Sequence, residues 1–419
     1  MKKVLIISYF FPPCNFVGAE RIAYWTKNLH KYQIYPVVVT RCWNEGQKDI
    51  IGKVDNNESK TIQNDKFEVN YVSYKNQLRD YFIKTPFIRK FFTLIYKLSY
   101  YIFPKKINYI NILKRSDEIL KKNPEIKTLI ISGRPFESFF FGYKLKKKYS
   151  YIQWIPDYRD QWNTYNDNRK KKIINKIFDY FDKRLEKKWT SNSSFFITTT
   201  NEWSNRISNL IDKKGKVILN GYSDGLKKIS INKASNSLKI VYAGTLYPNQ
   251  PIEKFISVVS KINTTHSNFI QLQFIGCEMI EGQKERLLNI KKTHKGNFEI
   301  IDRIPKAELN DYLANADFFY LTNFEDVKGW YPVKLFEYAC YQKPIILYPS
   351  DEDIIDNFIK LTNSGFSFFN DNDVESFLIQ SIQQTKENRL YKTKVNINEL
   401  KKFSRKYQTK KLAELIKEI

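Results

Sequence analysis

The residues with the clearest chemistry in this 419-residue chain stand directly after short apolar segments. Asp157 and Arg159 follow Tyr151–Ile155, which is rich in aromatic and β-branched residues, as is typical of a buried strand. A carboxylate within hydrogen-bond reach of a hydroxyl can accept its proton, and a guanidinium can bind a phosphate through two parallel hydrogen bonds. We therefore expect Asp157 and Arg159 to be the catalytic pair, with Asp160 bracing Arg159 and Trp162 packing below the loop.

A second group of polar residues begins at Pro332, which precedes the apolar run Val333–Cys340 and predicts a helix start there. Lys334 then lies in the first turn, where the helix dipole disfavours a cation and a bound anion would remove the conflict. Glu337, about one turn later, offers two acceptor oxygens that suit a ribose diol. The segment therefore indicates a site for an anion and a diol. Taken alone, it favours the alternative of a surface Lys and Glu on a core helix.

The first expected strand, Val4–Ser8, leads to a glycine that permits close approach of a ligand to the backbone. Gly18 and Ala19 open a helix whose first amides can bind an anion. Arg21 lies in the same turn, again against the helix dipole. The alternative for this arginine is a surface pair with Glu20.

Two further strand ends carry candidate binding residues. Gly244 and Thr245 follow the expected strand Lys239–Ala243 and can donate backbone and hydroxyl hydrogen bonds. A tight turn explains Gly244 equally well. Arg134 follows the expected strand Thr128–Ser132 and is therefore expected at the ligand-binding edge of the sheet.

Short apolar segments alternate with helical stretches along the chain, and the pattern restarts after residue 238. It predicts an α/β protein with two doubly wound, Rossmann-like domains whose parallel sheets are buried on both faces. Open sheets of this kind bind ligands at the carboxyl ends of their strands, so the two domains are expected to face each other across a cleft. The expected strands are Val4–Ser8, Pro36–Thr40, Thr128–Ser132, Tyr151–Ile155, Phe195–Thr199, Lys239–Ala243, Leu272–Ile275, Phe298–Ile301, Phe318–Leu321 and Pro344–Tyr348.

The domain boundaries follow from changes in composition. Residues 1–220 form the expected first domain, and the polar, turn-rich stretch 221–238 is the expected linker. Residues 239–395 form the second domain. Residues 396–419 are expected to form a Lys-rich amphipathic helix.

The charge balance points to an anionic partner. Lys and Arg number 70 against 44 Asp and Glu, which gives a net charge of +26. Nucleotide phosphates, a membrane surface and nucleic acid all fit such a charge. Nucleic acid is not expected, because the basic residues are dispersed and no recognised nucleic-acid module is present.

No metal site is expected. The four cysteines are scattered without a CxxC pair and only three histidines are present, which excludes an ordinary zinc set and indicates a reducing, cytoplasmic compartment. The pairs Asp351/Asp353 and Asp371/Asp373 are interpreted as helix N-terminal caps.

Residues 81–110 interrupt the strand–helix alternation by mixing aromatic residues with cations. Such a helix can lie in a membrane interface, which would place the protein peripherally on the inner face of the cell membrane. A helical pair packed on the first domain, its basic face in water, is the slightly favoured alternative. The cations are Lys84, Arg89, Lys90, Lys97, Lys105 and Lys106.

From residue 4 to about residue 350 the chain resembles the family 4 glycosyltransferases, because six blocks occur in that family's order. The blocks are LIISYFFPPCNFVGAER, IQWIPDYRDQW, TTTNEWSNRI, VILNGYSDG, IVYAGTLYP and YPVKLFEYACYQKPII. The resemblance implies the GT-B fold, with the final helix over 396–419 returning to the first domain, and a hexosyltransferase-type enzyme that retains anomeric configuration. It implies transfer from a nucleotide sugar, UDP favoured over GDP, to a glycan or lipid-linked oligosaccharide in bacterial surface-polysaccharide synthesis. No cofactor is obligatory, since the nucleotide sugar is a substrate.

The resemblance also assigns residues to the donor. It implies that Glu337 binds the nucleotide ribose and that the backbone at Arg303 and Ile304 contacts the base. The expected donor-binding residues are Gly18, Ala19, Arg21, Gly244, Thr245, Arg303, Ile304, Pro332, Lys334 and Glu337.

The chain departs from the family pattern at two positions. Many relatives have a glutamate where this chain has Gly329, and an Arg and a Lys in the loop occupied here by Thr245, Asn249 and Gln250. These departures leave two alternatives open: a GT-B epimerase acting on a nucleotide sugar, and a catalytically inactive sugar-nucleotide or glycan-binding subunit.

Overall fold

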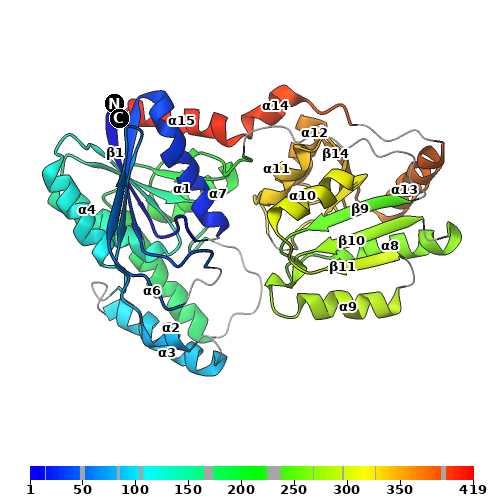
Figure 1. Cartoon of the computed structure of the whole chain (residues 1–419), viewed down its shortest axis with the longest axis horizontal. Coiled ribbons are helices and arrows are strands. Elements are labelled where there is room, and N and C mark those ends of the chain that lie inside the picture. Colours follow the sequence, from blue (N-terminus) through cyan, green and yellow to red (C-terminus); the bar gives the residue numbers. More distant parts are fainter. Residues whose placement is uncertain are drawn as a thin grey trace. The chain divides into compact units, whose positions relative to one another are not determined.

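The computed structural model describes residues 1–14, 16–47, 52–82, 85–102, 107–164, 173–223, 237–267, 269–294, 297–325, 327–387 and 393–419. These residues form two compact units, shown in Figure 1. The first holds the described residues up to Asn220 together with Arg405–Ile419, and the second holds those of Gly221–Ser404. Most of the expected linker lies outside the described residues, as do Lys84, Lys105 and Lys106.

The first unit is built on an eight-stranded sheet, counted over the described residues, in the order β3-β4-β2-β1-β5-β6-β7-β8. All neighbouring strands are parallel except β3 and β4. The strands are β1 (Lys2–Ser8), β2 (Ile34–Arg41), β3 (Lys60–Gln63), β4 (Glu68–Val72), β5 (Thr128–Ser132), β6 (Gln153–Tyr158), β7 (Phe196–Thr198) and β8 (Gly215–Val217).

Helices join the strands of this first sheet and lie along it, as Figure 1 shows. They are α1 (Val17–Asn28), α2 (Leu78–Tyr81), α3 (Pro86–Ile102), α4 (Asn111–Lys122), α5 (Phe139–Lys148), α6 (Ile173–Thr190), α7 (Asn201–Ile211) and α15 (Arg405–Lys417). Glycine at position 142 of α5 allows that helix to lie close to β6, because a Cβ there would be 2.5 Å from the fully buried Trp154 ring. The packing therefore holds β6, and the residues that follow it, against α5.

The central strands of this sheet end at one edge. Ser8 of β1 pairs with Ser132 of β5, and Ser132 pairs with Asp157 of β6. Parallel strands share their carboxyl edge, so the segments after β1, β5 and β6 start side by side. This register positions the first group of candidate residues.

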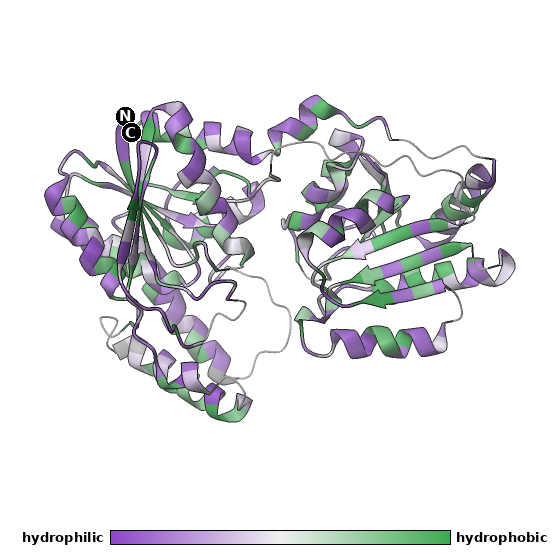
Figure 2. Ribbon diagram, in the orientation of Figure 1, coloured by the Kyte–Doolittle hydropathy of each residue, from purple (hydrophilic) through white to green (hydrophobic). Residues whose placement is uncertain are grey.

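The second unit has a six-stranded, all-parallel sheet over its described residues, in the order β11-β10-β9-β12-β13-β14. Figure 2 shows apolar residues along its central strands, which pack with α8 and α13 in one buried cluster. The strands are β9 (Leu238–Ala243), β10 (Ile270–Ile275), β11 (Asn297–Ile301), β12 (Phe318–Leu321), β13 (Ile345–Leu347) and β14 (Gly365–Ser367). The helices are α8 (Ile252–Thr265), α9 (Gln283–Thr293), α10 (Lys306–Asn315), α11 (Val333–Ala339), α12 (Ile354–Thr362), α13 (Asp371–Lys386) and α14 (Ile397–Lys402).

The expected single helix over 396–419 is wrong, because the structure divides it into α14 in the second unit and α15 in the first. Asn396 caps α14, and the Ser404 hydroxyl donates to the Lys401 carbonyl at 2.7 Å just after its end. Such a side-chain bond to the backbone competes with continuation of a helix.

The helix α15 packs against α1 of the first unit. Arg405 forms an ion pair with Glu20 at 2.5 Å, and the Lys2 amine donates to the Ile416 carbonyl at 2.7 Å. The two chain ends therefore lie together in Figure 1. The expected alternation of strands and helices with parallel sheets is confirmed for both units.

Candidate functional site

A buried ion pair lies at the carboxyl edge of the first sheet. Arg21 Nη2 is 3.0 Å from Asp157 Oδ1, and neither side chain is more than 4% exposed. Asp157 Oδ2 has no hydrogen-bond partner among the described residues. The pair joins the first turn of α1 to the end of β6, two segments that the sequence separates by more than a hundred residues.

The same guanidinium also bonds to the segment that follows β8. Arg21 Nη1 donates to the Leu219 carbonyl at 2.7 Å and to Asn220 Oδ1 at 3.4 Å. The alternative of a surface pair with Glu20 is wrong, since Glu20 binds Arg405. Arg21 is therefore engaged on two sides within its own unit.

Arg159 lies against the start of α1. Its Nε donates to the Gly133 carbonyl at 3.0 Å, and a Cβ on Gly18 would be only 1.6 Å from its Nη1. The side chain is nine-tenths buried, yet its Nη atoms make no hydrogen bond among the described residues. Burial lowers the pKa of Arg159, while Asp160 and Asp157 act to raise it.

This arrangement is suited to an oxyanion. The helix α1 begins after Phe16 without a side-chain cap, so its first amides are available as donors, as are the Arg159 Nη atoms. The Ala19 amide already donates to the Phe16 carbonyl at 2.9 Å. A side chain at position 18 would displace the guanidinium of Arg159 from the start of α1. This explains why a glycine is suited to position 18.

The residues after Arg159 pair differently from the expectation. Asp160 lies 3.5 Å from Arg134 Nε on the exposed side of the loop, and the Gly133 carbonyl, not Asp160, holds Arg159. Trp162 stacks on Phe136 with ring centroids 5.2 Å apart, which confirms its packing role. Arg134 is thus brought to the same edge as Arg159 but is well exposed.

In the second unit, Lys334 lies over the end of β9. Its Nζ donates to the Thr245 carbonyl at 3.1 Å and sits 3.7 Å from the centroid of the Tyr242 ring. Its Cε is 3.7 Å from the position of a Cβ on Gly244, a residue with φ of +97° that favours glycine. Burial lowers the pKa of Lys334 to about 7, while Cys277 and Glu337 act to raise it.

The structure brings three of the expected donor residues of this unit, Gly244, Thr245 and Lys334, together at the end of β9. Pro332 is the residue before α11, as the sequence predicts, and Lys334 and Glu337 lie on that helix. Arg303 and Ile304 follow β11, and β10 separates them from β9. The Arg303 amide donates to Glu278 Oε1 at 2.7 Å, and the Arg303 Cα lies 3.7 Å from the position of a Cβ on Gly276, the residue after β10.

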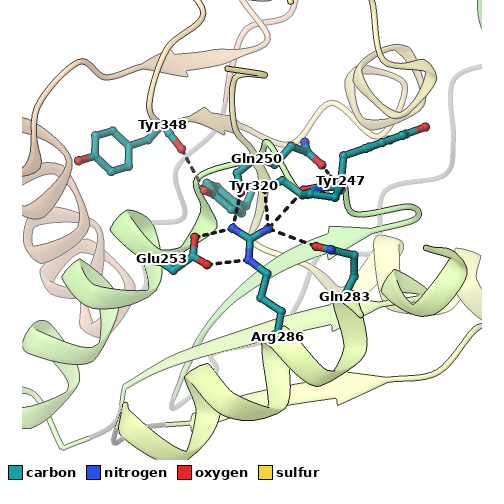
Figure 3. Close-up of polar contacts among 8 residues, drawn as sticks. Tyr247, Gln250, Glu253, Gln283, Arg286, Tyr320 and Tyr348 are labelled. Atoms are coloured by element: carbon teal, nitrogen blue, oxygen red, sulfur yellow. Dashed lines mark hydrogen bonds and ion pairs between the residues drawn. The ribbon is translucent and has the colours of Figure 1, made fainter. Parts of the chain in front are cut away.

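A residue that the sequence analysis missed holds the loop after Thr245. Arg286 of α9 binds both carboxylate oxygens of Glu253 at 2.6 Å. It also donates to the carbonyls of Gln250 at 2.8 Å and of Tyr247 at 3.3 Å, as Figure 3 shows. Arg286 lies on a polar helix about forty positions from this loop, and no motif marks it.

The Gln250 side chain completes this support. Its Oε1 accepts from the Tyr247 amide at 2.9 Å and from the Tyr242 hydroxyl at 3.0 Å. The amine of Lys334 in turn lies over the face of the Tyr242 ring. Gln250 therefore points into the loop after β9. Where many relatives have an Arg and a Lys in this loop, the cation near β9 here is Lys334 of α11.

The acidic pairs act on the backbone. Asp351 accepts from the Ile355 and Asp356 amides at 2.9 Å, which confirms its capping role, whereas Asp353 accepts from the Gly329 amide at 2.5 Å. Gly329 has φ of +71°, a conformation that favours glycine over glutamate.

The second acidic pair differs from the expectation. Asn370 caps α13 by accepting from the Asp373 amide, and Asp371 bonds to the Tyr348 hydroxyl. Asp371 and Asp373 both lie in the first turn of that helix, where negative charge suits its dipole. Within the described ranges, no group of three or more His, Cys, Asp or Glu side chains is placed to hold a metal ion.

The structure is similar to solved glycosyltransferases of the GT-B fold. Sucrose-phosphate synthase from Thermosynechococcus elongatus superposes with a TM-score of 0.65 at 12% identity, over 100% of this chain and 99% of that one. HepE of Anabaena, solved with UDP and glucose, gives 0.60 at 10% identity, over 100% of both chains. An E. coli trehalose-6-phosphate structure bound with UDP-2-fluoro glucose gives 0.58 at 10%, over 100% and 99%. No family model and no curated protein sequence matches the chain.

We predict that Lys334→Met changes how stability depends on pH. Burial lowers the folded-state pKa of Lys334 from 10.5 to about 7, so between these values the unfolded chain binds more protons than the folded protein. Lys334 therefore makes the free energy of unfolding rise with pH in this window, by at most about 1.4 kcal/mol per pH unit. Urea unfolding from about pH 6 to pH 9.5 should show the variant gaining stability over wild type most below pH 7, with the gap closing as the pH rises.

Lys254→Met is the matched control for this measurement, because it removes one positive charge from the exposed face of α8 in the same unit. A stability gap for Lys334→Met that does not vary across the pH range would contradict the burial of this amine.

Proposed function

We propose that the chain is a retaining glycosyltransferase that moves a sugar from a nucleotide sugar, with UDP favoured, to a glycan or lipid-linked oligosaccharide. The observation that carries the proposal is that, in a GT-B fold, each of the two sheets presents a cation at its carboxyl edge. Arg159 does so in the first unit and Lys334 in the second. A substrate with a diphosphate leaving group needs such charges where negative charge develops.

The donor binds mainly to the second unit in this proposal. Lys334, the Thr245 hydroxyl and the start of α11 receive the diphosphate, whereas the Gly244 amide already donates to the Ile275 carbonyl at 2.8 Å. Glu337 accepts hydrogen bonds from the ribose hydroxyls. The Arg286 clamp keeps the loop after β9 in place before the donor arrives, so less ordering is needed on binding. The backbone near Arg303 and Ile304 borders the base.

The reaction proceeds by attack on the face from which the diphosphate leaves. The acceptor oxygen bonds to the anomeric carbon, the bond from that carbon to the phosphate oxygen breaks, and the hydroxyl proton passes to the departing diphosphate. In the second unit, Lys334 stabilises the charge that develops on that leaving group, and in the first unit Arg159 offers N–H donors to an oxyanion. Arg134, the exposed cation of the first unit, meets the acceptor.

Asp157 acts as a positioning residue in this scheme, although the sequence suggests a base. It has no exposed surface, and its Oδ1 is bound by Arg21. A carboxylate so placed supplies the counter-charge for the arginines of this edge.

The first test is a thermal-shift panel of UDP, GDP, ADP, CMP and dTDP on wild type and Glu337→Ala. A ligand that binds only the folded protein stabilises it by about 2.7 kcal/mol at a hundred times its dissociation constant. We expect UDP to give the largest shift in wild type, undiminished by EDTA, and Glu337→Ala to lose most of it. Glu285→Ala, on the exposed side of α9, is the matched control and should behave as wild type. A wild type indifferent to all five nucleotides would overturn the proposal.

The second test concerns Gly18. A Cβ at this position would overlap the end of the Arg159 side chain, which can swing away, so Gly18→Ala should fold with a loss of no more than about 1 kcal/mol. Transfer activity with a UDP-sugar donor should nevertheless fall by at least about tenfold, as should that of Arg159→Lys, since the oxyanion donors move.

Arg115→Lys is the control for these variants, because Arg115 is a surface residue of α4 bound to Asn70 and Glu118. Full activity of Gly18→Ala, with Arg159 displaced in its crystal structure, would remove Arg159 from the mechanism.

A membrane-bound acceptor would bring the first unit to an anionic lipid surface, and α3 is suited to such contact. The helix has cations and, over Pro86–Ile102, no acidic residue, with Phe87 85% exposed and Phe91 57% exposed. Aromatic rings at the headgroup level with cations against anionic lipid are the usual basis of interfacial binding. No helix in the described part of the chain is long and apolar enough to span a bilayer.

The third test is co-sedimentation with vesicles. We expect wild type to bind phosphatidylglycerol-containing vesicles, and the double variant Phe87→Ser/Phe91→Ser to bind at least about tenfold more weakly, since burial of apolar area is lost. Phe369→Ser, which removes a ring of similar exposure from the second unit, is the control. Equal partitioning of all proteins would show that α3 is not a membrane contact, without affecting the nucleotide result.

A further inference from the structure

A second arginine of the first unit is wholly buried and unpaired. Arg41 ends β2 at the carboxyl edge of the sheet and is 0% exposed. Its Nε, Nη1 and Nη2 all lack a hydrogen-bond partner among the residues that the structure describes. A buried charged group without hydrogen bonds strongly destabilises the folded protein, as does removal of one partner from a buried ion pair.

Aromatic rings surround this guanidinium. Its carbon lies 3.5 Å from the centroid of the Trp43 ring, 3.9 Å from Tyr74 and 4.8 Å from Tyr9. Ring faces attract a cation and offset part of its desolvation. They offer no acceptor in the plane of the guanidinium, so its five N–H donors stay unused.

Further unpaired donors lie in the same cluster. Arg79 stacks on Tyr96 at 4.2 Å with its Nε unpaired, and the Tyr96 hydroxyl donates to Asn108 Oδ1 at 3.2 Å. The Nδ2 of Asn108 is buried and also lacks a partner in the described residues. The Tyr74 ring that stacks on Arg41 bonds through its hydroxyl to Asp80, the neighbour of Arg79 in α2, so the two arginines belong to one cluster.

The acceptors nearby are fewer than these donors. Asp80 Oδ2 accepts from the Tyr74 hydroxyl at 3.1 Å and from the Gln77 amide at 2.7 Å, while Asp80 Oδ1 and Gln77 Oε1 are buried without a partner in the described residues. Burial raises the pKa of Glu137, which favours its neutral form, although Arg79 acts to lower it. The unpaired donors of the cluster therefore outnumber its unpaired acceptors, since Arg41 alone has five N–H groups against Asp80 Oδ1 and Gln77 Oε1.

We propose that Arg41, Arg79 and the Asn108 amide form a binding site for an oxyanion, the phosphate or carboxylate of an acidic acceptor. The planar guanidinium matches the two oxygens of such a group, and the aromatic rings exclude water from the pair. That the oxyanion belongs to the acceptor rests on the proposed transferase function; the binding site itself does not.

The position of the cluster supports this assignment. Trp43, which stacks on Arg41, also stacks on Phe10 with centroids 5.6 Å apart, and Phe10 lies 5.1 Å from the Arg159 guanidinium. Two stacked rings, Trp43 and Phe10, thus lie between the guanidinium of Arg41 and that of Arg159. Arg79 and Asp80 are on the four-residue helix α2, so α2 must move to admit a ligand.

The experiment uses the full chain as wild type, Arg41→Met and the surface control Arg115→Met. Inorganic phosphate, D-glucuronate and UDP are each added at constant ionic strength, and thermal stability is followed with hydrogen exchange of residues 74–82. We expect phosphate or glucuronate to stabilise wild type and Arg115→Met and to slow exchange in 74–82, and Arg41→Met to bind at least about tenfold more weakly. The more effective probe identifies the oxyanion. Without ligand, Arg41→Met should melt higher than wild type, because an unpaired buried charge is replaced by an apolar chain.

The outcomes separate this site from the proposed function. A UDP shift in all three proteins with phosphate and glucuronate inert in wild type would mean that the cluster holds only water, and would overturn the site. Anion-induced protection of 74–82 that persists in Arg41→Met would overturn it as well. Loss of the UDP shift in wild type would count against the transferase and leave the anion result standing. If Arg41→Met does not fold, Arg79→Met, at a partly exposed position, gives the same comparison.

Discussion

The arrangement of the first unit depends on the buried ion pair between Arg21 and Asp157. Arg21 of α1 contacts Asp157 at the end of β6 and also Leu219 and Asn220 after β8. These three segments therefore meet at this arginine. A buried charge of either sign alone would be strongly unfavourable, so each residue requires the other. With this pair formed, the start of α1 stands beside Arg159, and the unpaired donors of that arginine face a helix start without a side-chain cap.

The second unit also holds a buried cation at the edge of its sheet, but through a different set of contacts. Its cation, Lys334, is held over the Tyr242 ring by the Thr245 carbonyl, and the loop beneath is fixed by Arg286 and Gln250. A cation in a desolvated position is costly without a ligand, and this burial lowers the pKa of Lys334 to about 7. Both units therefore hold positive charge that an anionic ligand would stabilise.

The positions of the strands followed from the sequence where strands are buried on both faces. Thr128–Ser132 and Phe318–Leu321 were predicted with the observed bounds, because a short continuous apolar run is typical of a parallel strand that is buried on both faces. Lys60–Gln63 was missed because this antiparallel edge strand is exposed along its whole length and carries no apolar pattern. The break between α14 and α15 was missed because both halves share a Lys-rich, amphipathic composition.

The sequence by itself determined the α/β class, the strand ends where chemistry is placed, and the residue types available there. Residue types and strand ends are local properties, set by apolar runs and by the glycines and prolines that bound them. Only the tertiary structure decided the partners: Arg21 with Asp157, Arg159 with Gly133 and Gly18, Arg286 with the loop after β9, and the enclosure of Arg41 by aromatic rings. Each of these contacts joins segments from different strands and helices, and the energy of a charge depends on its burial and its neighbours, which no local pattern records.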